Sequence, residues 1–314
     1  MSIIAEAPDF LQVFSDGTVK RFAPEIIPAS QESSGGYKSK DVIIDPSKQI
    51  TGRIFLPEII PEPCTLLPVL VYFHGGGFCI GSSTWSGYHH FLGDFSVASQ
   101  SIVLSIDYRL APEHRLPIAY DDCYSSLEWL CSQVTTNEPS WFKKADLSRV
   151  FLSGDSAGGN IAHQVGIRAM RNNNKAFNVK IKGLLLIHPY FGSEERTENE
   201  KADGAEGYVA MNDMFWGLSI PEWSNRDYFG CNIEKQEVSD GEWRGFPAVV
   251  VYVAGLDFLK ERGVMYAEFL QRKQVKNVTL VETEGESHVF HVFYPNSEAT
   301  RLLQKQMSEF MNQN

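Results

Sequence analysis

Short apolar runs alternate with longer amphipathic stretches along most of this chain. The runs predict strands at 69–73, 102–107, 149–153, 181–187, 248–254 and 277–282. Apolar positions at helical spacing predict helices at about 119–134, 157–171, 259–273 and 297–312. Two runs, Leu184–Ile187 and Val249–Val253, are apolar throughout, as in strands buried on both faces. The pattern therefore predicts an α/β fold with a mostly parallel central sheet flanked by helices.

Two regions depart from this alternation. Residues 10–22 predict a hairpin around Asp16–Gly17, and two short strands are expected at 41–45 and 52–56. A link with four prolines follows, which we expect to be irregular: Pro57, Pro61, Pro63 and Pro68. The second region, 190–243, is rich in aromatic residues and has no strand pattern. We expect a helical insertion there that walls a pocket; the alternative is a surface subdomain with its own small core.

Composition narrows the classes of function. The chain has 314 residues and a hydrophobic fraction of 43%, which suits one large domain spanning the whole chain. Its net charge of −11, with no basic run longer than a pair, argues against nucleic acid and anionic membrane surfaces as partners. We expect no signal peptide and, because no apolar stretch reaches roughly 18 residues, no membrane span. The eight histidines show no metal-ligand spacing, and we expect no cofactor.

The number and spacing of the cysteines indicate whether the protein works in a reducing or an oxidising compartment. There are five of them, an odd number, and they form no Cys-x-x-Cys pair: Cys64, Cys79, Cys123, Cys131 and Cys231. Reduced thiols in the cytosol fit this usage best, so we expect a cytoplasmic protein. The sequence makes no prediction about the oligomeric state.

The first motif with chemical content is Gly154-Asp-Ser156-Ala-Gly158, between the run at 149–153 and a helical segment. A serine on a tight strand-to-helix turn exposes its Oγ, and glycines two residues before and after remove side chains that would collide there. The helix behind Ser156 directs its free N–H groups toward developing negative charge. Ser156 is therefore a candidate nucleophile.

A second motif, His74-Gly-Gly-Gly77, follows the apolar run at 69–73. Consecutive glycines let backbone N–H groups approach a substrate oxygen, and such a loop accompanies the serine turn as an oxyanion hole. The alternative is a glycine-rich connection after a core strand. The serine motif about 80 residues downstream favours the oxyanion hole.

A serine hydroxyl needs a base, and the base needs a group that holds its tautomer. His288 follows the last expected strand directly, so we prefer it to His291, while His188 precedes a proline and is expected to pack at a strand end. Asp257 follows the preceding strand and is the favoured acid, although it suits a helix N-cap as well. Four carboxylates are less favoured by position: Asp240, Glu282, Glu284 and Glu286.

Together these motifs resemble one family, the plant carboxylesterases of the hormone-sensitive-lipase-like group of α/β hydrolases. The resemblance spans roughly residues 8–312 and is carried by His74–Phe78, Asp107–Pro117, Gly154–Asn160, Gly255–Leu259 and His288. It implies the α/β-hydrolase fold and a Ser156, His288 and Asp257 triad. It implies an oxyanion hole made by the N–H groups of Gly76, Gly77 and Ala157, and a cap formed by about 1–40 and 190–243.

The expected function is therefore hydrolysis of a small-molecule ester through an acyl-enzyme, without a cofactor. Relatives implied by the resemblance include a hormone receptor that lost the histidine, which is less favoured because His288 and Gly77 are present. Lyases and cyclases of specialised metabolism reuse the same pocket, and the motifs leave this alternative open. The chain departs from the family at Leu259-Lys-Glu-Arg262, where an Arg-Asp pair is more common, and this puts helix-surface contacts in doubt but not the triad.

Overall fold

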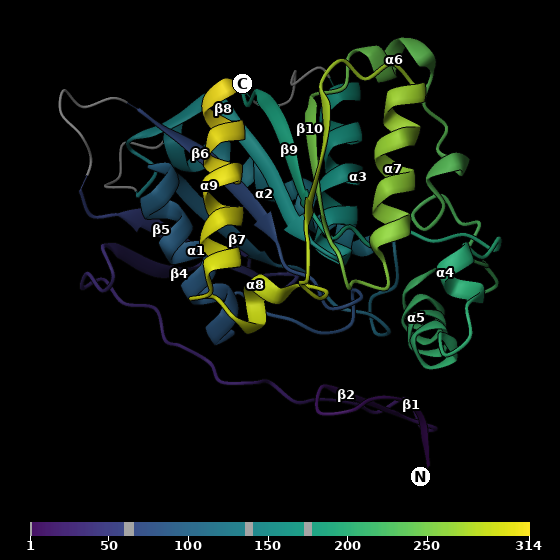
Figure 1. Cartoon of the computed structure of the whole chain (residues 1–314). Coiled ribbons are helices and arrows are strands. Elements are labelled where there is room, and N and C mark those ends of the chain that lie inside the picture. The colour runs from purple at the N-terminus through teal and green to yellow at the C-terminus, as the bar shows by residue number, and fades with distance from the viewer. Residues whose placement is uncertain (1, 60–65, 136–140, 173–177) are drawn as a thin grey trace.

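The computed structural model describes residues 2–59, 66–135, 141–172 and 178–314, and in these ranges it forms an eight-stranded and a three-stranded sheet (Figure 1). The strand order of the large sheet is β11-β10-β9-β8-β6-β7-β5-β4. Its parallel strands are β6 (Leu67–Phe73), β7 (Ile102–Asp107), β8 (Ala145–Asp155), β9 (Ile181–Ile187), β10 (Ala248–Ala254) and β11 (Val278–Thr283). The antiparallel pair β4 (Tyr37–Asp45) and β5 (Ile50–Pro57) extends the edge beside β7. The predicted fold class is confirmed.

Helices cover both faces of the large sheet (Figure 1). On one face, α1 (Ser86–Ser99) packs beside α9 (Glu298–Gln313); on the other lie α2 (Ile118–Thr135), α3 (Ala157–Arg171) and α7 (Lys260–Arg272). The strands alternate accordingly, since Val69 and Val71 of β6 face the α2 side while Leu70 and Tyr72 face the α1 side. Because all of these side chains are fully buried, the hydrophobic effect stabilises the sheet from both faces, as the apolar runs predict.

The N-terminal segment forms its own sheet below the carboxyl ends of the large one (Figure 1). The predicted hairpin is confirmed as β2 (Leu11–Phe14) and β3 (Val19–Arg21), and β1 (Ile3–Ala7), which we did not predict, pairs with β2. Arg21 anchors this sheet to the rest of the fold, because its guanidinium donates to the carbonyl oxygens of Cys79 and Ala111 at 2.6 and 2.9 Å and pairs with Glu113.

The stretch from 190 to 243 contains short helices. They are α4 (Glu198–Lys201), α5 (Glu206–Ser219), the 3-10 helix η1 (Ile233–Lys235) and α6 (Asp240–Arg244). A further short helix, α8 (Phe290–Phe293), precedes α9. In Figure 1, α4 and α5 lie below the large sheet, on the same side of it as β1 and β2.

One helix was not predicted and one expectation, the irregular proline link, was wrong in part. Pro61 and Pro63 of that link lie outside the described residues. Helix α1 was not predicted, because its sequence mixes glycine, serine and aromatic residues of low helix propensity. Pro57 and Pro68 were expected in an irregular link but are the last residue of β5 and the second of β6. Proline is tolerated at strand ends, and the register of β6 against β8 shifts at this position, so the missing N–H disrupts little.

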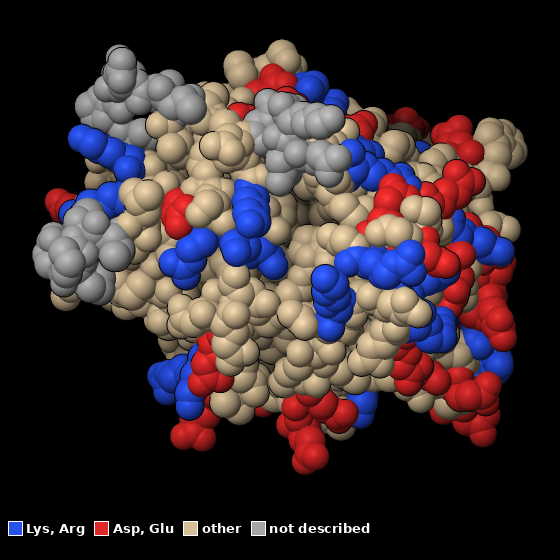
Figure 2. All heavy atoms as spheres, turned by 90° about the horizontal axis from the view of Figure 1, so that it is seen from above, with Lys and Arg blue, Asp and Glu red and all other residues tan. Residues whose placement is uncertain are grey.

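Charged side chains are mixed over the face shown in Figure 2, where lysines and arginines lie among acidic and uncharged residues. Among the described residues, no helix has the length and apolar composition needed to cross a membrane. That nucleic acid is not a partner stays a prediction.

Candidate active site

Ser156 lies on a sharp turn between β8 and α3. Its backbone has a φ of 51° and a ψ of −119°, a conformation that costs energy for a residue with a side chain. The turn leaves Ser156 at the N-terminus of α3, where the helix dipole favours negative charge. The local sequence produces this geometry because a buried strand runs directly into a helix without a connecting loop.

The glycines around Ser156 are required by close packing. A Cβ atom on Gly154 would lie 2.5 Å from the carbonyl oxygen of Phe73, and one on Gly158 would overlap that same carbonyl. The backbone of the turn therefore rests directly on the end of β6, which carries the glycine-rich loop. This agrees with the steric role expected for the two glycines.

His288 and Asp257 form a hydrogen-bonded pair. The Nδ1 atom of His288 lies 2.7 Å from Oδ2 of Asp257, and the other carboxylate oxygen accepts the N–H of Leu259 at 2.8 Å. Burial lowers the pKa of His288, but the Asp257 charge and hydrogen bond outweigh it and hold that pKa above its usual 6.5. Burial raises the pKa of Asp257, and the opposing interaction with His288 brings it below its usual value. The pair is thus arranged to stabilise an imidazolium.

The two other downstream histidines are placed differently. His291 is fully buried, its Nδ1 atom has no hydrogen-bond partner among the described residues, and burial holds its pKa well below the usual value. His188, also buried, accepts the N–H of Val289 at 2.9 Å. Its side chain therefore supports the loop that carries His288, whereas the side chain of His288 is 32% exposed and reaches the pocket.

A buried carboxylate holds the glycine-rich loop in place. Asp155, next to the serine, accepts hydrogen bonds from the hydroxyls of Tyr72 and Tyr88 at 2.7 and 2.9 Å and from the N–H of Gly75 at 3.0 Å. Burial raises the pKa of Asp155 above its usual value despite these bonds. The network fixes the start of the loop relative to the serine turn.

The loop itself turns its backbone toward the pocket. Gly76 and Gly77 have φ values of 102° and 58°, which favour glycine, and both line the pocket. Within the described residues, no hydrogen bond uses the N–H of Gly76, Gly77 or Ala157. Three backbone donors are therefore available near the serine.

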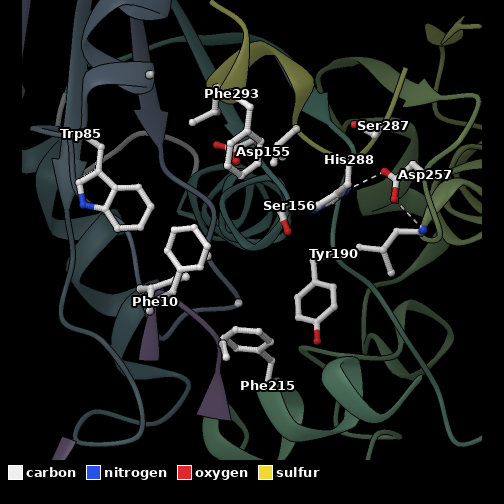
Figure 3. Close-up of a pocket in the computed structure, with 18 of the residues that line it drawn as sticks. Phe10, Trp85, Asp155, Ser156, Tyr190, Phe215, Asp257, Ser287, His288 and Phe293 are labelled. Carbon is white, nitrogen blue, oxygen red and sulfur yellow. Dashed lines mark hydrogen bonds and ion pairs between the residues drawn. The ribbon is translucent and has the colours of Figure 1, made fainter. Parts of the chain in front are cut away.

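These groups surround one pocket of about 800 Å³. Ser156, Asp257 and His288 all line it, so the structure brings the three sequence candidates together. Figure 3 shows the Ser156 hydroxyl directed into the opening between aromatic rings. The rings include Phe10 from the turn between β1 and β2, Phe215 from α5, and Tyr190.

Among the described residues, one group has the spacing of a metal site. Ligand atoms of His188, Asp257 and His288 lie within 4.8 Å of one another. The Asp257 oxygens and the His288 Nδ1 atom are already joined in hydrogen bonds, and the Nδ1 atom of His188 accepts the Val289 N–H. This donor set fits an acid–base pair better than a metal ion.

Comparison with known proteins agrees with this geometry. The α/β hydrolase fold family matches residues 70–292. Probable carboxylesterase 1 of Arabidopsis thaliana is 35% identical to the chain, over 96% of it and 95% of that protein. A chloroplastic tuliposide A-converting enzyme of Tulipa gesneriana is 37% identical, over 92% of the chain and 73% of that protein. The chain belongs to the plant carboxylesterase family of α/β hydrolases.

Solved structures agree with this assignment. An esterase from the archaeon Pyrobaculum calidifontis superposes on this α/β hydrolase with a TM-score of 0.73 and 26% identity. The match covers 88% of this chain and 85% of the archaeal one. The likeness therefore extends well beyond the serine turn.

Sequence reasoning missed part of the site of this α/β hydrolase. Tyr72 and Tyr88 contact Asp155 across 83 and 67 residues, and no local pattern marks such bonds. Trp85 and Glu25 of the pocket wall lie in segments for which we predicted no element. A signal was available for α1, since Tyr88, Phe91, Leu92 and Phe95 recur at helical spacing and are buried.

Proposed function

We propose that this protein hydrolyses carboxylic esters of small molecules through a covalent acyl-enzyme. The observation that carries the proposal is the serine turn beside the hydrogen-bonded His288 and Asp257 pair, on the wall of one apolar pocket. Members of its family bear the name carboxylesterase, which supports the same reaction.

The residues have these roles in the proposed mechanism. The Oγ of Ser156 attacks the ester carbonyl carbon while Nε2 of His288 takes its proton. Asp257 stabilises the imidazolium, and the N–H groups of Gly76, Gly77 and Ala157 hold the oxyanion. The C–O bond breaks, His288 protonates the leaving alcohol, and a water molecule deprotonated by His288 then releases the acid.

We propose that the first 40 residues or so and residues 190–243 act as a cap on a single domain. Phe10, Tyr208 and Phe215 come from these segments and line the pocket, which supports this division. Relatives named tuliposide A-converting enzymes favour an ester of plant specialised metabolism as substrate. The cytoplasmic location stays a prediction, since the tulip relatives are named chloroplastic.

Covalent labelling tests the proposal. An organophosphonate ester should label the protein once, on the peptide that contains Ser156, because labelling requires an activated Oγ and donors for the phosphonyl oxygen. Ser156→Ala should abolish the label and ester turnover while the circular dichroism spectrum is unchanged. If a Ser156→Ala variant converted a native metabolite at nearly the wild-type rate, the acyl-enzyme mechanism would be wrong and the protein would be a lyase.

A further inference from the structure

Ionisable side chains on the pocket wall are predominantly acidic. Among the described lining residues there is no lysine or arginine, while Glu25, Asp155 and Asp257 are present. His288 is the lining side chain that gains positive charge near neutral pH, and the Asp257 carboxylate 2.7 Å away balances it. Asp155 is buried behind its tyrosine hydroxyls. Glu25 is the remaining acidic residue of the described lining, and its side chain is exposed.

The backbone holds Glu25 on the wall. Its carbonyl oxygen accepts the N–H of Ser86 at 2.8 Å, and the N–H of Ile27 donates to the carbonyl of Thr84 at 2.9 Å. The side chain is exposed, and within the described residues it takes part in no ion pair or hydrogen bond. The N-terminus of α1 lies on the same wall with a partial charge of about +0.5, which offsets the carboxylate only in part.

Aromatic residues lie next to the backbone of Glu25. Ile26 pairs with Trp85 in an isolated β-bridge, so Trp85 lies beside the backbone of Glu25. The rings of Phe10 and Trp85 stack with centroids 6.0 Å apart, and Figure 3 shows both beside the opening in front of Ser156. An acidic residue near partly buried aromatic rings on a pocket wall is the chemistry that attracts ammonium groups.

We propose that the pocket selects its ester by charge, with Glu25 as the residue that sets this selectivity. Esters that carry a positive charge away from the carbonyl are favoured over neutral esters of the same shape, and esters with a free carboxylate are rejected. The net charge of −11 acts in the same direction on approaching substrates. This inference rests on the proposed esterase function and adds its substrate class.

The test compares a cationic and a neutral ester of the same shape, together with an anionic ester. Acetylcholine and 3,3-dimethylbutyl acetate have the same shape, with nitrogen replaced by carbon, and 4-acetoxybutanoate supplies an anion. At low ionic strength we expect kcat/KM to be about fivefold higher for acetylcholine than for its carbon analogue, and lowest for the anion. Added salt should reduce the difference, because it screens a partly exposed carboxylate. Should alkyl acetates turn over too slowly, choline and 3,3-dimethylbutanol are compared as inhibitors of p-nitrophenyl acetate hydrolysis.

Two matched variants locate the effect. Glu25→Gln should bring the ratio of cationic to neutral ester close to one. Glu128→Gln, on the exposed side of α2, removes the same charge outside the pocket and should keep both the ratio and the basal activity. Equal kcat/KM values for the cationic, neutral and anionic esters in the wild type would overturn this inference alone. A cationic-to-neutral ratio that Glu25→Gln leaves unchanged would do the same. No turnover of any ester, p-nitrophenyl acetate included, would overturn the esterase proposal.

Discussion

The two walls of the pocket differ in which part of the chain forms them. At the strand ends, Gly154 and Gly158 leave no room for a Cβ atom, and Asp155 is hydrogen-bonded from three sides. In α5, Met211, Asn212 and Phe215 line the pocket with partly buried side chains. A wall fixed by close backbone contacts tolerates few substitutions, whereas one made of partly buried side chains tolerates more. We therefore assign the chemistry to the first wall and the choice of acyl-chain length to the second.

The largest expected effect separates His288 from His291 on the tightly packed wall. His288→Ala should lower kcat by roughly 10⁶-fold, as for other members of such triads. His291→Ala should keep most of the activity per folded molecule, although it leaves a cavity and lowers stability. Kinetics of both purified variants with p-nitrophenyl acetate check this, and the reverse pattern would make His291 the base.

The pH profile of the wild-type enzyme belongs to the same prediction. Neutral His288 accepts the proton, and its pKa is held above 6.5, so kcat/KM should rise with pH through an ionisation above 6.5. Activity is thus lost as the pH falls below the pKa of His288. A profile that levels off well below pH 6.5 would contradict the raised pKa.

A second substitution on this wall has a smaller effect. Asp257→Asn should lower kcat by about 10⁴-fold, because an amide cannot hold His288 in the required tautomer. Loss of the negative charge should also lower the pKa seen in the residual activity. Asp240→Asn, at the start of α6, is the control, and a similar loss there would mean that the acid has been misassigned.

A third prediction joins the two walls. A Cβ atom on Gly77 would lie 2.5 Å from the Phe215 ring of α5, so Gly77→Ala should displace the loop and lower kcat by about 10²-fold to 10³-fold. Adding Phe215→Ala should restore part of the activity, since it removes the ring. No recovery in the double variant would show that backbone strain at Gly77 alone causes the loss.

The smallest effect concerns the wall formed by α5. Rings of this wall limit the depth of the pocket, so p-nitrophenyl acetate and butyrate should be hydrolysed faster than the palmitate. Phe215→Ala alone should relax this preference by a few fold, mainly in KM, because it widens the pocket and leaves the side chains of Ser156, Asp257 and His288 unchanged. Efficient turnover of emulsified long-chain triglyceride would contradict a cap of limited depth.

Local patterns explain why the large sheet and the three site candidates were predictable. The apolar runs define the strands, and Ser156, Asp257 and His288 each follow a strand end, where parallel strands bring them to one edge. Contacts between distant segments were not predictable. Only folding brings the Asp155 carboxylate to the hydroxyls of Tyr72 and Tyr88, and Glu25 to Trp85, because these residues lie far apart in the sequence. Helix α1 falls between these cases, since burial stabilises a segment that helix propensity disfavours.

The bonds of Arg21 have a consequence for synthesis on the ribosome. Its partners Cys79, Ala111 and Glu113 lie 58 to 92 residues further along the chain. At about 5–20 residues per second, the hairpin that contains Arg21 leaves the ribosome on the order of ten seconds before its last partner. The part of the pocket wall that is translated first is therefore anchored late, and the nascent chain exposes the apolar face of that hairpin during the interval.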